Sequence, residues 1–206
     1  MHAFRIFREY LSGLRALHDL GPCITVFGSA RLPGDDPAVA QARELGGLLA
    51  DAGFAVMTGG GPGVMEAANR GAFERGGSSI GCNIKLKVEQ HPNPYLDEVV
   101  TFQHFFIRKV MLVKYSSGFV ALAGGFGTYD EVFEAATLIQ TGKIDNFPIV
   151  LVGTEFWNPL LDVLVSDLLA RGTIAGSDVA EFFVTDSVTE AVEHLERRCP
   201  PVPARA

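Results

Sequence analysis

The chain has 206 residues, of which 17 are Lys or Arg and 24 are Asp or Glu, so its formal net charge is −7. The length suits one domain with a full hydrophobic core, and a hydrophobic fraction of 48% excludes an intrinsically disordered chain. The acidic balance argues against proteins that bind nucleic acid or a membrane surface through a basic face, but a few local cations can still hold a small phosphorylated ligand.

The predicted elements begin with a helix over residues 4–18 and continue as strands that alternate with helices. Asp36 is the expected N-cap of the second helix, with Pro37 at its first position. The predicted strands are 23–27, 54–57, 78–83, 98–102, 118–122, 148–152 and 181–184. The predicted helices after the first are 37–52, 63–75, 103–115, 128–141, 156–171 and 187–198.

This alternation predicts βαβ units and therefore one α/β domain over residues 1–206. We expect a Rossmann-like, doubly wound parallel sheet with helices on both faces. The N-terminal helix lies within residues 1–21, and residues 199–206 form a flexible tail. Ligands of such sheets bind beyond the carboxyl ends of the strands, where loops lead into helix N-termini.

No segment of the sequence is suited to entering a membrane. No apolar run reaches the ~20 residues needed to cross a bilayer. Charges at Arg5, Arg8 and Glu9 interrupt the N-terminal segment, unlike the apolar core of a signal peptide. We therefore expect a cytoplasmic protein with no membrane partner.

Three cysteines, Cys23, Cys82 and Cys199, are too widely spaced for a CxxC pair. Their pattern favours neither a disulfide framework nor a zinc site, and we expect no metal and no other cofactor. The mean hydropathy of +0.22 is high for a monomer. It predicts apolar surface buried between two copies of the chain, as in a homodimer.

Two glycine-rich loops follow predicted strands and lead into helices, at 59–63 and 124–127. Glycines there let backbone N–H groups approach an anion at the positive end of a helix dipole. One such loop could be only a tight turn, but two at the same sheet edge favour phosphate binding. We predict that Gly60 and Gly61 of the first loop contact the ligand.

The kind of phosphate site can be narrowed. The dinucleotide fingerprint G-x-G-x-x-G fails in both loops, because Val64 and Asp130 occupy the third glycine position. The P-loop pattern is absent as well, since no Lys follows either loop at the required spacing. A mononucleotide monophosphate fits better than NAD or the ATP-hydrolysing P-loop class.

The predicted helix 103–115 is apolar nearly all round, which predicts a buried helix. It carries Arg108, Lys109 and Lys114 but no carboxylate of its own. Buried cations need an anion, so the partner is either an acidic residue of another element or a ligand. His104 precedes Arg108 by four residues, and we expect a structural role for it.

Carboxylates follow both glycine loops. Residues 128–131 are expected in the first turn of a helix, where helix capping accounts for Asp130. Glu131 lies close enough to the loop to face a bound ligand. Glu66 has the equivalent position after the first loop and is a further predicted substrate-binding residue.

Three segments together resemble the LOG (lonely guy) family, which is often mislabelled as lysine decarboxylase. They are residues 59–72, the pair Arg108 and Lys109, and residues 124–131, which resemble the motif P-G-G-x-G-T-x-x-E. The resemblance spans residues 22–195, and the longer bacterial members, with an extra N-terminal helix, look closest. A pyridoxal phosphate decarboxylase would need a lysine placed for a Schiff base, which nothing in these motifs requires.

The resemblance implies a usually dimeric protein that hydrolyses the N-glycosidic bond of nucleoside 5′-monophosphates. AMP and cytokinin riboside monophosphates are the typical substrates of the family, which implies cytokinin biosynthesis. By position, Arg108 and Glu131 match its catalytic residues. The positions that match its substrate-binding residues are Lys109, Gly124, Gly125, Gly127 and Thr128. Ala123 stands where the motif has Pro, so we expect a looser loop.

Under this hypothesis Glu131 stabilises the sugar cation and activates water, and Arg108 offsets charge on the ligand. One alternative is a non-catalytic nucleotide or molybdenum-cofactor carrier on the same scaffold, which would not need the Arg–Glu pair. Another is a nucleosidase of broader base scope.

Overall fold

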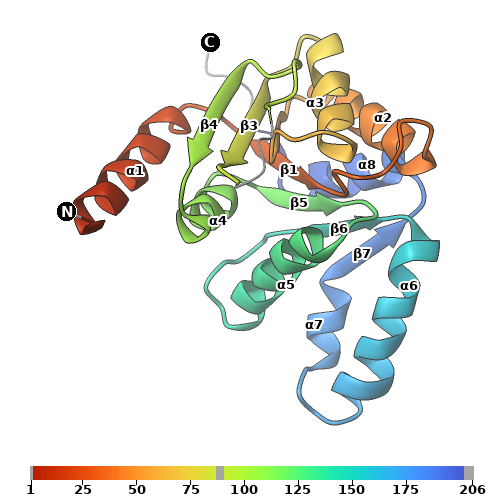
Figure 1. Ribbon diagram of the computed structural model, residues 1–206. Coiled ribbons are helices and arrows are strands. Elements are labelled where there is room, and N and C mark those ends of the chain that lie inside the picture. Colours follow the sequence, from red (N-terminus) through yellow and green to blue (C-terminus); the bar gives the residue numbers. More distant parts are fainter. Residues whose placement is uncertain (1, 87–90, 202–206) are drawn as a thin grey trace.

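The computed structural model describes residues 2–86 and 91–201, and within these ranges seven strands form one sheet (Figure 1). All neighbouring strands are parallel, in the order β4-β3-β2-β1-β5-β6-β7. The strands are β1 (Cys23–Phe27), β2 (Ala55–Thr58), β3 (Ser79–Ile84), β4 (Glu98–Phe102), β5 (Gly118–Ala121), β6 (Ile149–Val152) and β7 (Phe182–Thr185).

Helices fill most connections between these strands. They are α1 (His2–Ala16), α2 (Pro37–Asp51), α3 (Val64–Glu74), α4 (Phe105–Lys114), α5 (Phe126–Gln140), α6 (Thr154–Val163), a π-helical segment η1 (Leu164–Leu169), α7 (Gly176–Ala180) and α8 (Val188–Arg198). The side chain of Asp36 accepts a hydrogen bond from Ala38 N at 2.9 Å, which confirms the predicted N-cap of α2.

The hydrophobic core has two layers, one on each face of the sheet. One layer combines alternate strand residues such as Ile24 and Val26 with buried residues of α2, α3 and α8. The other combines Cys23 and Phe27 with Leu17, just after α1, and with buried residues of α4, α5 and α6. Helices therefore cover both faces, and the predicted doubly wound α/β fold is confirmed.

Strand β1 lies at the point where the strand order changes direction. It pairs with β2 on one side and β5 on the other, with Ile24 opposite both Val56 and Gly118. The connections leaving β1 and β5 therefore run to opposite faces of the sheet. Such a switch point opens a crevice at the carboxyl ends of the two strands.

Most helix boundaries differ from the prediction by one or two residues, and two helices differ in a way that changes the interpretation. Helix α5 begins at Phe126, two residues before the expected start, because Thr128 N and Tyr129 N already donate to Gly125 O. Asp130 and Glu131 therefore lie in its second turn, and the first-turn interpretation of these two acidic residues was wrong. The predicted helix 156–171 is helix α6 followed by η1, whose π-helical hydrogen bonds widen the turns. Helix α7 was not predicted, because it has only five residues.

Helix α4 is not buried all round, contrary to the prediction from its composition. Ile107, Met111 and Leu112 pack in the core, whereas Phe105 and Phe106 are about half exposed. In a doubly wound fold such a helix has the sheet on one side only, so its outer apolar residues face outward in a single chain.

Among the described residues, no helix is both long enough and apolar enough to cross a membrane. The end of the predicted flexible tail, residues 202–206, lies outside the described residues.

Candidate active site

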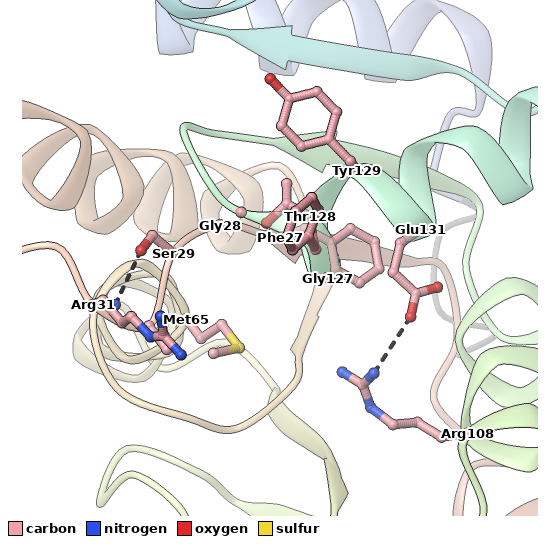
Figure 2. Close-up of a pocket in the computed structure, with 13 residues that line it drawn as sticks. Phe27, Gly28, Ser29, Arg31, Met65, Arg108, Gly127, Thr128, Tyr129 and Glu131 are labelled. Atoms are coloured by element: carbon pink, nitrogen blue, oxygen red, sulfur yellow. Dashed lines mark hydrogen bonds and ion pairs between the residues drawn. The ribbon is translucent and has the colours of Figure 1, made fainter.

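A cavity of about 870 Å³ lies at the carboxyl ends of β1 and β5, where the strand order reverses. This volume is within the range of small-molecule sites. Residues 27–31 form one side of it and residues 125–129 with Glu131 another, while Met65 and Arg108 complete the lining. Figure 2 shows the side chains of Arg108 and Glu131 pointing toward each other in this cavity.

Arg108 reaches the cavity from α4 and is held by three elements. Its Nε donates to the carbonyl of Cys82 on β3 at 2.9 Å, and its Nη1 donates to Oε1 of Glu131 on α5 at 3.3 Å. A Cβ built on Gly59, just after β2, would lie 2.8 Å from Nη2. The arginine side chain is only 12% exposed, so the guanidinium has one fixed place.

Glu131 is the most deeply buried carboxylate facing the cavity, with 3% of the residue exposed. Its Oε1 accepts from Arg108, but its Oε2 has no hydrogen-bond partner in the part of the chain that the structure describes. Burial raises the pKa of Glu131 to about 7, although Arg108 and Lys109 oppose this effect. A carboxyl group with one unsatisfied oxygen and a pKa near neutrality is suited to exchanging a proton with a ligand or water.

The N-terminus of α5 opens toward the same cavity. Gly125 is its N-cap and makes no side-chain cap, and a Cβ on Gly125 or Gly127 would meet no atom within 4 Å. Within the described ranges, the N–H groups of Phe126 and Gly127 have no acceptor. Gly124 lies beneath this turn instead, because a Cβ there would collide with Oγ1 of the buried Thr128. The arrangement offers backbone donors to an anion.

Lys109 points away from the cavity lining, toward the acidic side of α5. Its Nζ lies 2.9 Å from Oδ1 of Asp130 and 2.6 Å from Oε2 of Glu134. These acidic neighbours raise the pKa of Lys109 against the effect of its burial. The sequence left open whether the anion next to Lys109 is a ligand or an acidic residue of another element. The structure shows acidic residues of another element, Asp130 and Glu134 of α5. Asp130 is thus an ion-pair partner rather than a helix cap.

The first glycine loop lies beside the cavity but does not line it. Gly60 and Gly61 are tied instead to a buried polar network centred on Asn69, whose Oδ1 accepts from Thr58 Oγ1 at 2.5 Å and from Asn93 Nδ2 at 3.0 Å. Gly60 N donates to Thr58 Oγ1, and Asn93 Nδ2 donates to the Gly61 carbonyl.

Asn69 also binds the strand next to this loop, because its Nδ2 donates to Ser79 Oγ at 2.9 Å. Glu66, on the first turn of α3, is partly exposed and also lies outside the lining. The structure therefore brings Arg108, Glu131, Gly125, Gly127 and Thr128 together at the cavity. It places the other predicted substrate contacts, Lys109, Gly124, Gly60, Gly61 and Glu66, around it.

Residues of the loop after β1 were not predicted as part of the site. Ser29 and Arg31 line the cavity, as do Met65, Phe126 and Tyr129. The sequence does hold a signal for the loop, since 28–31 follow the first strand at the position where a dinucleotide fingerprint would lie. These residues reach the cavity only because β1 and β5 are neighbours in the sheet, and sequence periodicity does not specify which strands are neighbours.

His104 has the structural role that was expected. Its Nδ1 lies 2.8 Å from Oε2 of Glu9, and Oε1 of Glu9 accepts from the backbone N–H groups of Gln103 and His104. This contact joins α1 to the start of α4. Cys23 and Cys82 are buried thiols. Among the described residues, no group of three or more His, Cys, Asp or Glu side chains is placed to hold a metal ion.

A family model described as "possible lysine decarboxylase" matches residues 65–195. The cytokinin riboside 5′-monophosphate phosphoribohydrolase of Mycobacterium tuberculosis is 30% identical over 162 residues, which cover 78% of this chain and 84% of that protein. The Arabidopsis thaliana protein of that name, LOG1, is also 30% identical over 162 residues, covering 77% and 75%. This chain belongs to the LOG family.

The LOG fold is also seen in solved structures. The X-ray structure of the structural-genomics target TM1055 matches with a TM-score of 0.65 and 28% identity, covering 85% of this chain and 99% of that one. A molybdenum cofactor binding protein from the phototrophic bacterium Rippkaea orientalis matches with a TM-score of 0.61 and 25% identity, covering 86% and 96%. LOG proteins thus share this fold with a protein named for binding molybdenum cofactor.

This LOG sequence has Ala123 at the position where the family motif has proline. The Ala123 carbonyl accepts a hydrogen bond from Ser29 N at 3.0 Å, so residue 123 connects the loop after β5 to the loop after β1. A proline keeps its carbonyl oxygen, so this connection does not depend on which of the two residues is present.

Proposed function

We propose that this LOG protein hydrolyses the N-glycosidic bond of nucleoside 5′-monophosphates to free base and ribose 5-phosphate, with AMP and N6-substituted AMP as substrates. One observation carries the proposal, the buried carboxylate of Glu131 in a cavity of nucleotide size. One of its oxygens accepts a hydrogen bond from Arg108, and the other has no hydrogen-bond partner within the described residues. The names of the curated relatives support the same reaction class.

The 5′-phosphate would bind at the N-terminus of α5. Gly125 and Gly127 leave space there, and the helix dipole favours an anion at this end. Thr128 adds a hydroxyl at the same turn. With the phosphate fixed at this point, the ribose would lie toward Glu131, which follows on the same helix one turn later. Binding the phosphate at this point would hold the ribose in a fixed position relative to Glu131, which speeds a reaction compared with freely diffusing reactants.

Cleavage passes through a sugar with oxocarbenium character. The bond from C1′ to the base nitrogen breaks, and its electron pair leaves with the base, which takes a proton from solvent. A water oxygen bonds to C1′, and the water proton goes to the ionised Glu131, which then returns it to solvent. The same carboxylate stabilises the positive charge on the sugar. Arg108 stays protonated and offsets negative charge that develops on the ligand.

A base-release assay over AMP, GMP, CMP and N6-prenylated AMP tests this proposal. We expect free base from at least one adenine nucleotide, and a fall of about 100-fold or more in kcat for Glu131→Gln. Arg171→Gln is a suitable control, because Arg171 is exposed, pairs with Asp167 and is not part of the cavity lining. Turnover that survives Glu131→Gln would contradict the role given to this residue.

A second candidate function is a carrier of a nucleotide or of molybdenum cofactor. It is favoured by the match to the Rippkaea orientalis structure. A carrier needs the backbone donors of the α5 N-terminus but has no use for a carboxylate whose pKa lies near 7. Tight AMP binding with no base released during long incubation would favour the carrier.

We further propose that the protein is a cytoplasmic homodimer. Phe105, Phe106 and Val110 of α4 are exposed apolar residues on one helix, and Phe133 of α5 is exposed as well. Exposed apolar surface of this kind is typical of association sites. The three free thiols suit a reducing compartment. Light scattering coupled to size exclusion gives the mass in solution, and Phe106→Glu should shift it toward one chain.

A further inference from the structure

Arg31 is a cation of the cavity lining that the hydrolysis proposed above does not use. It follows β1 and lines the cavity together with Ser29 and Met65. The other lining cation, Arg108, is occupied by Cys82 and Glu131. In contrast, the guanidinium of Arg31 makes no hydrogen bond or ion pair with any residue in 2–86 and 91–201. It is therefore available to an anionic ligand.

The backbone that carries Arg31 is fixed in place. Arg31 N donates to Ser29 Oγ at 3.0 Å. Ser29 N donates to the Ala123 carbonyl at 3.0 Å, and the Ser29 carbonyl accepts from Val64 N at 3.0 Å. These bonds join the loop to the connection after β5 and to the start of α3. The side chain of Arg31 is exposed, and it starts from a backbone that these bonds hold at the cavity.

Arg31 brings the positive charge of the cavity closer to that of a phosphate dianion. Arg108 is already neutralised by Glu131 when that carboxylate is ionised. The N-terminus of α5 contributes roughly half a positive charge. A phosphate monoester carries a charge of about −1.5 to −2 at neutral pH. Arg31 supplies a further full positive charge on the side of the cavity away from Glu131, as Figure 2 shows.

We propose that Arg31 determines the specificity for phosphorylated ligands. Its guanidinium binds the phosphate oxygens that face away from the α5 N-terminus, so the site selects a nucleoside monophosphate over the nucleoside. This inference rests on the proposed function for the identity of the ligand. Arg31 is not a catalytic residue, because Glu131 and Arg108 lie at the other side of the lining.

The experiment compares the affinities of AMP and adenosine by titration calorimetry. The proteins are the wild type, Arg31→Gln, Arg31→Lys and the control Arg15→Gln. Arg31 is exposed and Arg15 lies on α1 outside this cavity, so all variants should fold. We expect Arg31→Gln to weaken AMP binding by about tenfold or more, the effect of one charge-assisted contact, with adenosine unchanged. Arg31→Lys should recover part of the loss, and Arg15→Gln should match the wild type.

Base release is then measured on the same proteins. For a residue that only binds phosphate, Arg31→Gln should raise KM for AMP while kcat changes little. Equal affinity of the wild type for AMP and adenosine would overturn the inference. An equal loss of affinity for AMP and for adenosine in Arg31→Gln would overturn it as well. If AMP binds through Arg31 but no base is released, the assignment of Arg31 stands and the proposed hydrolysis fails.

Discussion

The Arg108 guanidinium occupies space that a side chain at Gly59 would need: a Cβ on Gly59 would lie 2.8 Å from Nη2 of Arg108 and equally close to Sδ of Met65. Both obstructing atoms are at the ends of flexible side chains, so the backbone can stay in place while they move. The glycine at the end of β2 thus sets where the cation of the cavity rests.

Gly59→Ala should therefore displace Arg108 without unfolding the protein. We expect base release to fall by about tenfold or more, since displacing a positioned group by even 1 Å has large effects on rate. The free energy of unfolding should fall by about 1–2 kcal/mol at most. Kinetics on AMP together with a melting curve test both parts.

Gly176→Ala is the matched control for this substitution. Gly176 begins α7, and a Cβ there would meet no atom within 4 Å. Its kinetics should equal those of the wild type. Full activity of Gly59→Ala would show that the position of Arg108 does not limit the reaction.

Glu131 should make the protein less stable as the pH rises. Its pKa is about 7 in the folded chain against an ordinary value of 4.5, so the folded state holds the proton more tightly. The free energy of unfolding therefore falls between about pH 4.5 and 7, by roughly 1–3 kcal/mol. Glu131→Gln lacks this titration and should be the more stable protein at pH 8 but not at pH 4.5.

Melting curves at several pH values measure the difference between variant and wild type. Glu155→Gln, a change at an exposed carboxylate of α6, should show no such pH-dependent difference. A constant difference for Glu131→Gln across this range would mean that the pKa of Glu131 is not raised.

Lys109 should affect both the pKa of Glu131 and the stability of the protein. It lowers the pKa of Glu131, and it joins α4 to α5 through Asp130 and Glu134. Lys109→Met removes the charge and keeps the stem. The pKa of Glu131 then rises, and the acidic limb of the kcat/KM profile moves to higher pH. Because Asp130 is well exposed, we expect a stability loss of only about 1–2 kcal/mol.

A pH–rate profile and urea unfolding measure these two effects. Lys114→Met is the control, since Lys114 is an exposed lysine on the same helix that lies over the Tyr115 ring. Its profile should keep the wild-type shape. If Lys109→Met moves the limb to lower pH, the electrostatic influence of Lys109 on Glu131 has been assigned the wrong sign.

Asn69 should be important for stability although it is outside the cavity. It is fully buried, and its side chain binds Thr58, Ser79 and Asn93. Asn69→Ala leaves these groups unsatisfied, at a cost of about 2–4 kcal/mol. Urea unfolding measures this loss. The exposed Asn158→Ala should cost less than about 0.5 kcal/mol, and a similarly small effect for Asn69→Ala would rule out an essential network.

The sequence predicts the fold well because the hydrophobic pattern of each strand and helix is local, and helix α2 is also marked by its N-cap Asp36 and by Pro37. It also singles out Arg108 and Glu131, which belong to short motifs and which the structure brings together at the cavity. It does not show that Lys109 turns to Asp130 and Glu134, since helix α4 alone does not specify what packs beside it. The contribution of Arg31 is missed for a related reason: it depends on β1 lying next to β5, a contact between distant segments.

The hydrogen bond from Ser29 to Ala123 joins the two loops that flank the cavity across the middle of the sheet. With these loops bonded to each other, the width of the cavity between them is set before any ligand arrives. A ligand that fits then loses little affinity to loop ordering, and its association is not slowed by a conformational change at this point. Selection at this part of the cavity depends on shape and charge that are already present rather than on closure around the ligand.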